Sequence, residues 1–228
     1  MDLAASLWFD RGPLNRNRYI VVEGPIGVGK TTLVHALAKR LAARTVLEIV
    51  EENPFLASFY TDRGKYAFQT QLFFLLSRFK QQQELGQMDL FSGSTISDYL
   101  FAKDRLFAQV TLDPQEIMLY QKVYELMGPR VLKPDLVIYL QARLDVLLAR
   151  IKKRGREFER RFDAGYLAGL CEAYNEFFFH YDETPLLVVN TSDIDFVEDE
   201  QDLEGLLTAI GRMQKGTQHY HPVGSAAR

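Results

Sequence analysis

Short apolar segments alternate along this chain with longer segments in which apolar residues recur every three to four positions. The short segments are typical of strands buried on both faces, and the longer ones of amphipathic helices. The expected strands cover residues 19–22, 46–50, 95–97, 135–140 and 186–190. The expected helices cover residues 31–44, 66–84, 113–127, 144–153, 163–181 and 200–213.

Strands that alternate with helices predict an α/β fold, here a five-stranded parallel sheet flanked by helices. Ligands of such folds bind beyond the carboxyl ends of the strands. One helix start is marked in the sequence, because Asp113, Pro114 and Glu116 have the order of an N-terminal capping box.

Composition narrows the classes of protein to which the chain can belong. Its 228 residues are 47% apolar and 25% charged, which is typical of a soluble globular domain. We expect a domain over residues 18–214, with a flexible N-terminal extension (1–17) and a flexible C-terminal tail (215–228). The net charge of −3 argues against nucleic-acid and membrane partners. The absence of a long apolar run and the single Cys171 predict a cytoplasmic location.

The most specific motif is GPIGVGKT at residues 24–31, which matches a phosphate-binding loop (P-loop) in full. It follows an expected strand and opens an expected helix, as this motif requires. Backbone N–H groups of such a loop, and the start of the helix, bind phosphate. The motif predicts ATP and Mg²⁺, held by Gly24, Gly27, Val28, Gly29, Lys30, Thr31 and Thr32.

Carboxylates follow two of the expected strands. Asp98 follows strand 95–97, so with Thr31 it is the expected ligand pair for Mg²⁺. Glu51 and Glu52 follow strand 46–50, where a carboxylate can act as a general base toward a hydroxyl. The alternative is that these two glutamates only begin a loop before Asn53.

A basic run begins at Arg150 and includes Arg154 and Arg156. Such a run can be a solvated face or a polyanion-binding patch. In a chain that carries a P-loop, we interpret it as a lid, over about residues 150–162, whose arginines neutralise charge on a transferring phosphate.

These motifs in this order resemble the deoxynucleoside kinases, and the bacterial deoxyguanosine and deoxyadenosine kinase branch most of all. The resemblance extends from about residue 19 to residue 207 and is carried by residues 24–31, 51–55 (EENPF), 97–99 (SDY) and 150–159 (RIKKRGREFE). It implies a P-loop kinase fold with an arginine-rich lid, and a homodimer formed through helices 66–84 and 113–127.

The resemblance also implies roles for individual residues. Glu51 would be the general base, and Arg150, Arg154 and Arg156 the catalytic arginines of the lid. The substrate would be bound by Glu51, Tyr60, Gln71, Arg78, Asp98, Asp104 and Glu159. One position departs from the pattern, because Tyr99 stands where many members of the family carry an arginine that holds the 5′ end of the substrate.

The expected reaction is transfer of the ATP γ-phosphoryl group to the 5′-hydroxyl of a deoxynucleoside. The amide of Gln71 can pair with adenine or cytosine, while the resembled branch favours purines. Deoxyadenosine and deoxyguanosine are therefore the expected substrates, with deoxycytidine next and thymidine last. The alternatives are a nucleoside monophosphate kinase of the thymidylate type and a nucleotide-switched binding module.

Overall fold

A computed structural model describes residues 19–87, 93–127, 130–159, 162–194 and 199–221 of the chain. Within these residues a parallel sheet of six strands has the order β2-β3-β1-β4-β5-β6. The strands are β1 (Tyr19–Glu23), β2 (Arg44–Val46), β3 (Thr95–Ser97), β4 (Leu136–Gln141), β5 (Leu186–Asn190) and β6 (Thr217–Tyr220). Their carboxyl ends therefore lie at one edge of the sheet.

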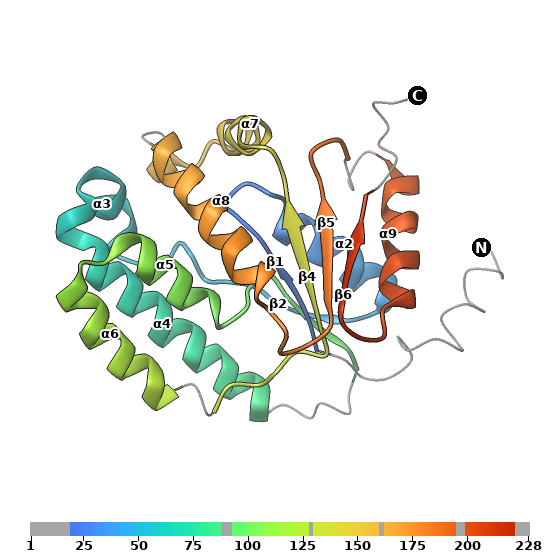
Figure 1. Cartoon of the computed structure of the whole chain (residues 1–228), viewed down its shortest axis with the longest axis horizontal. Coiled ribbons are helices and arrows are strands. Elements are labelled where there is room, and N and C mark those ends of the chain that lie inside the picture. The colour runs from blue at the N-terminus through green and yellow to red at the C-terminus, as the bar shows by residue number, and fades with distance from the viewer. Residues whose placement is uncertain (1–18, 88–92, 128–129, 160–161, 195–198, 222–228) are drawn as a thin grey trace.

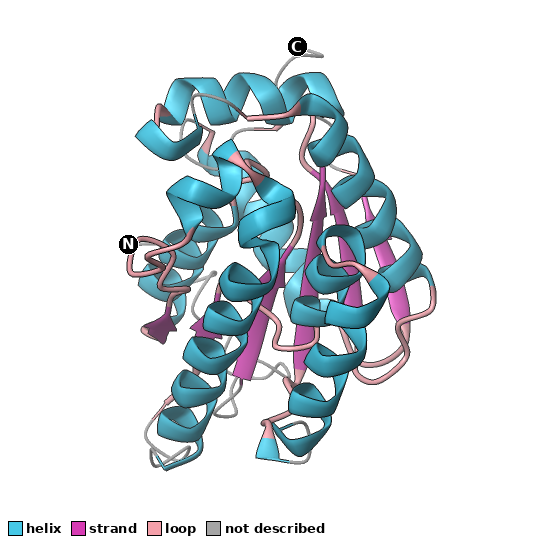
Figure 2. Cartoon of the chain, turned by 90° about the vertical axis from the view of Figure 1, so that its left-hand side faces the viewer, coloured by secondary structure: helices cyan, strands magenta, loops and turns pink. Residues whose placement is uncertain are grey.

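Helices cover both faces of the sheet. They are α2 (Lys30–Leu41), α3 (Leu56–Thr61), α4 (Arg63–Gln87), α5 (Lys103–Thr111), α6 (Pro114–Met127), α7 (Leu144–Arg154), α8 (Ala164–Phe179) and α9 (Glu200–Arg212), with the 3₁₀ turn η4 (Glu157–Glu159). Figure 1 shows α4, α5, α6 and α8 on one side of the sheet and α2 and α9 on the other. Figure 2 shows the strands of the sheet in magenta among the cyan helices. No helix in the described ranges is both long and apolar enough to span a membrane.

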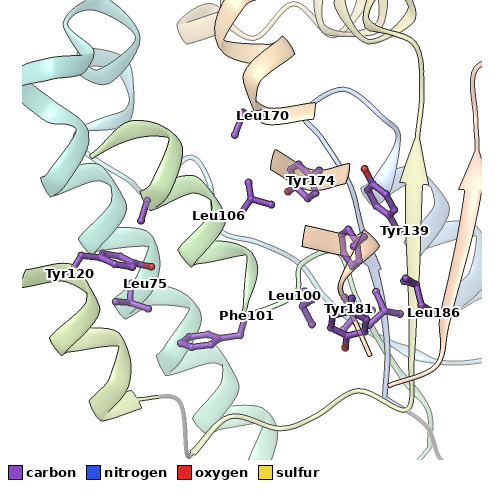
Figure 3. Packing of buried hydrophobic residues seen from close by; sticks show 14 of the residues in the cluster. Leu75, Leu100, Phe101, Leu106, Tyr120, Tyr139, Leu170, Tyr174, Tyr181 and Leu186 are labelled. Atoms are coloured by element: carbon purple, nitrogen blue, oxygen red, sulfur yellow. The ribbon is translucent and has the colours of Figure 1, made fainter. Parts of the chain in front are cut away.

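The side chains of β1 alternate between two hydrophobic cores, as the two-residue period of a strand requires. Val21 packs into the core beneath α4, α5 and α8, whereas Ile20 and Val22 pack into the core beneath α2 and α9. In Figure 3 the rings of Tyr139 on β4 and Tyr174 on α8 face each other, with centroids 6.1 Å apart and planes 10° apart. Burial on both faces explains why β1 and β4 are apolar up to their last residue.

Most expected elements are confirmed, and so is the cap of α6. The carboxylate of Asp113 accepts hydrogen bonds from the backbone N–H groups of Gln115 (2.8 Å) and Glu116 (2.9 Å). Glu116 returns a bond by accepting from the Asp113 N–H at 3.1 Å. This reciprocal pair satisfies donors that a helix start leaves free.

Three expectations about the elements are wrong. The second strand is Arg44–Val46 and not 46–50, because its partner β3 is short and the register pairs Arg44 with Thr95. Helices α3 and α5 lie in segments where no helix was expected. The sheet has a sixth strand, β6, inside the expected flexible tail (215–228), because residues 217–220 pair with the exposed edge of β5.

Candidate active site

The P-loop joins the end of β1 to the start of α2, and close packing requires two of its glycines. Gly24 has φ 151°, and a Cβ there would lie 2.4 Å from the Leu140 carbonyl oxygen of β4. Gly27 has φ 85°, and a Cβ there would lie 2.8 Å from Ile151 of α7. Any other residue would push the loop away from these elements. The loop is thus held between β4 and α7.

Lys30 and Thr31 begin α2 and face different partners. The Lys30 ammonium donates to the carbonyl oxygens of Gly24 (2.7 Å) and Pro25 (3.2 Å), inside the loop. Burial lowers the pKa of Lys30 to about 8, although nearby carboxylates such as Glu23 oppose the shift. The Thr31 hydroxyl donates to the Asp98 carboxylate at 2.7 Å. A hydroxyl and a carboxylate side by side are oxygen ligands of the kind that Mg²⁺ prefers.

A cleft of about 690 Å³ opens beside the P-loop at the carboxyl edge of the sheet. It brings together most of the residues expected to form the site. Its lining includes Gly27, Val28, Gly29, Lys30, Thr31, Thr32, Glu51, Tyr60, Gln71, Arg78, Asp98, Arg150, Arg154, Arg156 and Glu159. Gly24 supports the loop from behind, and Asp104 is fully buried behind Arg78, to which it is ion-paired.

Two carboxylates from the loop after β2 reach the cleft in different environments. The Glu51 side chain is 63% exposed and forms an ion pair with Arg156 at 2.8 Å. The Glu48 side chain is only 13% exposed and accepts hydrogen bonds from Arg78 Nε (2.8 Å) and Lys103 Nζ (2.8 Å). The Glu48 backbone N–H also donates to Asp98 Oδ1 at 2.7 Å. Of the two, Glu48 is the carboxylate inside the cleft, next to the Thr31–Asp98 pair.

The electrostatics of Glu48 keep it ionised. Burial alone would raise the pKa of its carboxyl, but the charges and hydrogen bonds of Arg78 and Lys103 outweigh burial and hold the pKa well below its usual range. The sequence reasoning missed Glu48 because the expected strand 46–50 placed it within the sheet. With β2 ending at Val46, Glu48 follows the strand closely, at the edge where ligands bind.

The other end of the cleft is suited to a planar ring. Gln71 on α4 is buried, and its Oε1 has no hydrogen-bond partner among the described residues. Phe74 and Phe107 add aromatic walls to the same cleft. The ion pair with Asp104 fixes the guanidinium of Arg78 beneath this region. A buried amide oxygen without a partner costs free energy unless a ligand supplies the missing donor.

Tyr60 on α3 lines the cleft beside η4, which belongs to the segment expected to form the lid. Its ring stacks on Phe158 of η4, with centroids 5.9 Å apart and planes 16° apart. Burial, followed by the charge of Glu159, raises the pKa of the Tyr60 hydroxyl above its usual value. Tyr60 therefore presents a neutral hydroxyl, which can donate and accept one hydrogen bond each.

The three arginines expected in the lid have different partners. Arg150 donates to the backbone oxygens of Val28, Thr191 and Ile194, and so ties α7 to the P-loop. Arg154 is paired with the buried Glu159, with atoms 2.5 Å and 3.2 Å apart. Arg156 reaches across to Glu51. Arg154 and Arg156 therefore bind carboxylates that line the cleft, whereas Arg150 donates hydrogen bonds to backbone oxygens.

The residue after Asp98 contributes no cation. The Tyr99 side chain is fully buried beside Tyr19 and Gln82, which hydrogen-bond to each other at 3.0 Å. A cation that the sequence reasoning did not single out, Lys103, lines the cleft from the first residue of α5. Lys103 begins a helix that was not expected from the sequence, so no pattern marked it as a site residue.

A P-loop that faces a buried carboxylate and an arginine-rich segment across one cleft defines a P-loop phosphotransferase. A model of the deoxynucleoside kinase family matches residues 20–214. The chain belongs to the deoxynucleoside kinase family, and it is an ATP-dependent phosphotransferase.

Relatives with curated functions agree with this assignment. The chain is 39% identical over 202 residues to a deoxyguanosine kinase of Bacillus subtilis (strain 168), across 86% of this chain and 98% of that protein. It is 33% identical over 203 residues to a deoxyadenosine/deoxycytidine kinase of the same organism, across 86% and 92% of the two chains. Among solved structures, deoxyadenosine kinase from M. mycoides with bound dATP is similar, with a TM-score of 0.72 and 27% identity over 85% of this chain and 98% of that one. These comparisons confirm the resemblance and the α/β kinase fold.

Proposed function

We propose that this protein transfers the γ-phosphoryl group of ATP to the 5′-hydroxyl of a purine deoxynucleoside. The observation that carries the proposal is that Glu48, whose backbone N–H binds Asp98 of the Thr31–Asp98 pair, lines the same cleft as the buried amide of Gln71. A nucleoside whose base meets Gln71 can present its 5′ end to Glu48 and to the P-loop. The reacting groups are then held together in one cleft that excludes much of the solvent.

Each residue near the reacting atoms has a distinct role in this proposal. Lys30 and the P-loop N–H groups bind the phosphates of ATP. Thr31 and Asp98 hold Mg²⁺, which neutralises charge on the phosphate oxygens when it is bound. Glu48 orients the 5′-hydroxyl and accepts its proton. We assign this role to Glu48 rather than to the expected Glu51, because Glu51 is exposed and already paired with Arg156.

The substrate contacts away from the reacting atoms are also proposals. Tyr60 and Glu159 face the sugar from the side of the lid segment, and Arg154 holds Glu159 in place. Gln71 pairs with the base, while Asp104 fixes Arg78 at the cleft floor. The buried amide and the names of the relatives together favour deoxyadenosine and deoxyguanosine, followed by deoxycytidine and then thymidine.

A homodimer is part of the same proposal. Helix α6 exposes large apolar side chains, with Met118 64% and Leu126 77% exposed, and Leu76 is 47% exposed on the neighbouring α4. Apolar side chains gathered on adjacent helices favour burial against a second copy. Sedimentation of Met118→Asp and Leu126→Asp variants tests this, because each charge would lower the dimer fraction if these helices meet.

The function is tested by a panel of the four deoxynucleosides and their monophosphates with Mg-ATP. We expect turnover with deoxynucleosides and none with Lys30→Ala, whose folding is checked by circular dichroism. Preferential phosphorylation of monophosphates would indicate a nucleoside monophosphate kinase instead. Hydrolysis of ATP at a rate independent of any nucleoside would indicate a nucleotide-switched module.

A further inference from the structure

Tyr99 leaves a position in the reaction site without the positive charge that the resemblance predicts there. Its side chain is packed beside Tyr19 and Gln82 and does not contribute to the lining described for the cleft. Phosphoryl transfer develops negative charge on oxygens at the junction of donor and acceptor. A cation at that junction therefore has to come from another residue.

Lys103 brings an ammonium group to this junction. Its side chain is only 3% exposed, and its Nζ lies 2.8 Å from Glu48 Oε2 and 3.9 Å from Glu23 Oε2. It lines the same cleft as Lys30 of the P-loop. Lys103 therefore contacts Glu48 on the acceptor side and shares the cleft with Lys30 on the donor side.

Neutralising buried carboxylates would be a purely structural explanation for Lys103, but both carboxylates have other partners. Glu48 is bound by Arg78 through two nitrogen atoms. Glu23 accepts hydrogen bonds from the N–H groups of Gly24 (2.8 Å) and Leu100 (2.7 Å) and from the Tyr174 hydroxyl (2.9 Å). Removing Lys103 would thus leave each carboxylate hydrogen-bonded. Lysine is rarely buried without a reason. A lysine that is buried in a ligand cleft, where the carboxylates already have other donors, indicates a cation with a function.

We propose that Lys103 is a catalytic residue that binds the transferring phosphoryl group where it meets the 5′-oxygen, and so supplies the charge that Tyr99 cannot. This inference rests on the proposed function. In the step itself, the 5′-oxygen forms a bond to the γ-phosphorus as the bond from that phosphorus to the β–γ bridging oxygen breaks, and ADP leaves. The proton of the 5′-hydroxyl passes to Glu48. Lys103 keeps its protons throughout and stabilises the oxygens by charge and hydrogen bonding.

The test uses two neutral replacements and one charged replacement of the same residue. Lys103→Met removes the charge at similar length, and Lys103→Gln also removes the charge but keeps an N–H donor for Glu48. Both variants should lose roughly 10²-fold or more in kcat, the usual loss for one transition-state donor. The KM for the deoxynucleoside should change by less than about threefold, since this charge acts mainly in the transition state. Lys103→Arg should recover kcat to within about tenfold of wild type.

Lys80→Met is the matched control, because Lys80 is an exposed lysine on α4 whose recorded partner is Glu84. It should leave kcat unchanged. A Lys103→Gln protein with near wild-type kcat would overturn the inference. An equal loss of kcat in Lys103→Arg and Lys103→Gln, in parallel with a fall in their melting temperatures, would also overturn it. A purely structural role for Lys103 predicts that outcome. A wild-type protein inactive on all four deoxynucleosides would instead refute the proposed function.

Discussion

The hydroxyl of Thr31 and the carboxylate of Asp98 meet at 2.7 Å, although 67 residues separate them in the sequence. One belongs to the first turn of α2 and the other directly follows β3, and pairing of β3 with β1 brings them together. The second oxygen of Asp98 accepts from the Glu48 N–H at 2.7 Å. Asp98 thus connects the phosphate side of the cleft to the carboxylate of the acceptor side.

Replacing Asp98 by Asn should weaken Mg²⁺ binding, so that catalysis requires a higher Mg²⁺ concentration. The amide keeps the size and an acceptor oxygen but loses the charge that attracts a divalent cation. We expect the Mg²⁺ concentration for half-maximal activity to rise by about tenfold or more. Asp62→Asn, at an exposed position before α4, is the control. An unchanged Mg²⁺ titration for Asp98→Asn would remove Asp98 from the metal site.

Glu48→Gln and Glu51→Gln separate the two candidate bases. Glu48→Gln should lower kcat by roughly 10²-fold or more, because a positioned base typically contributes 10²–10⁴-fold. Glu51→Gln should cost far less, since that carboxylate is exposed and paired with Arg156. Steady-state kinetics with saturating ATP measure both effects. The reverse order of losses would return the role of base to Glu51.

Nucleotide binding should take up protons near pH 8. Burial lowers the pKa of Lys30 in the free protein to about 8. At that pH, Lys30 is therefore neutral in about half of the protein molecules. Bound phosphates favour the charged form and raise this pKa, so the complex holds more protons than the free protein. Affinity for ATP should therefore fall as pH rises through about 8.

Calorimetry in buffers of different ionisation enthalpy measures this uptake directly. We expect about half a proton per site at pH 8 and much less at pH 6.5. Lys30→Arg is the control, because a guanidinium stays charged over this range. Equal uptake in the Arg variant would assign the proton to another group.

Arg150 and Arg156 should behave differently although both belong to the basic run. Arg150→Ala removes donors from three backbone oxygens and should lower the free energy of unfolding by about 1–3 kcal/mol. Arg156→Ala should lower kcat with little change in stability, since its recorded ion pair is with the exposed Glu51. Urea unfolding and kcat measured on the same samples distinguish the two. A stable, slow Arg150→Ala protein would mean that Arg150 leaves the backbone when substrate binds.

Gln71→Leu should flatten the preference among bases. The buried amide oxygen has no described partner, so it is available to a donor on the base. Loss of a two-point contact should cost about 1–3 kcal/mol in kcat/KM for the preferred deoxynucleoside and less for the others. Gln81→Leu is the control, because Gln81 lies on the same helix but is not among the residues that line the cleft. An unchanged ranking of bases in Gln71→Leu would mean that another side chain reads the base.

The fold was predictable wherever local patterns determine it. Central strands such as β1 and β4 are apolar up to their last residue, and three residues that begin at Asp113 predict the helix cap. The ends of the edge strands β2 and β6 were not predictable. Pairing with a strand that is distant in sequence determines where they begin and end, and their own composition does not.

The same limit explains which site residues were missed. The P-loop is contiguous, so Lys30 and Thr31 are evident in the sequence. Glu48 and Lys103 contact each other at 2.8 Å because β2 ends at Val46 and α5 begins at Lys103. Neither boundary was expected from the sequence, so the pair was not predicted. With strand 46–50 expected in place of Arg44–Val46, Glu51 and not Glu48 was expected to follow the strand, and the role of Glu51 as base stays a prediction.

The strand order also determines when a growing chain can first bind nucleotide. β1 leaves the ribosome early, but its neighbour β4 is completed only at residue 141. At about 5–20 residues per second, the apolar β1 waits on the order of ten seconds for that partner. Until then Leu140 is missing, and the loop at Gly24 has no wall to pack against. Nascent chains halted before residue 136 should therefore carry the complete P-loop sequence and still fail to retain ATP.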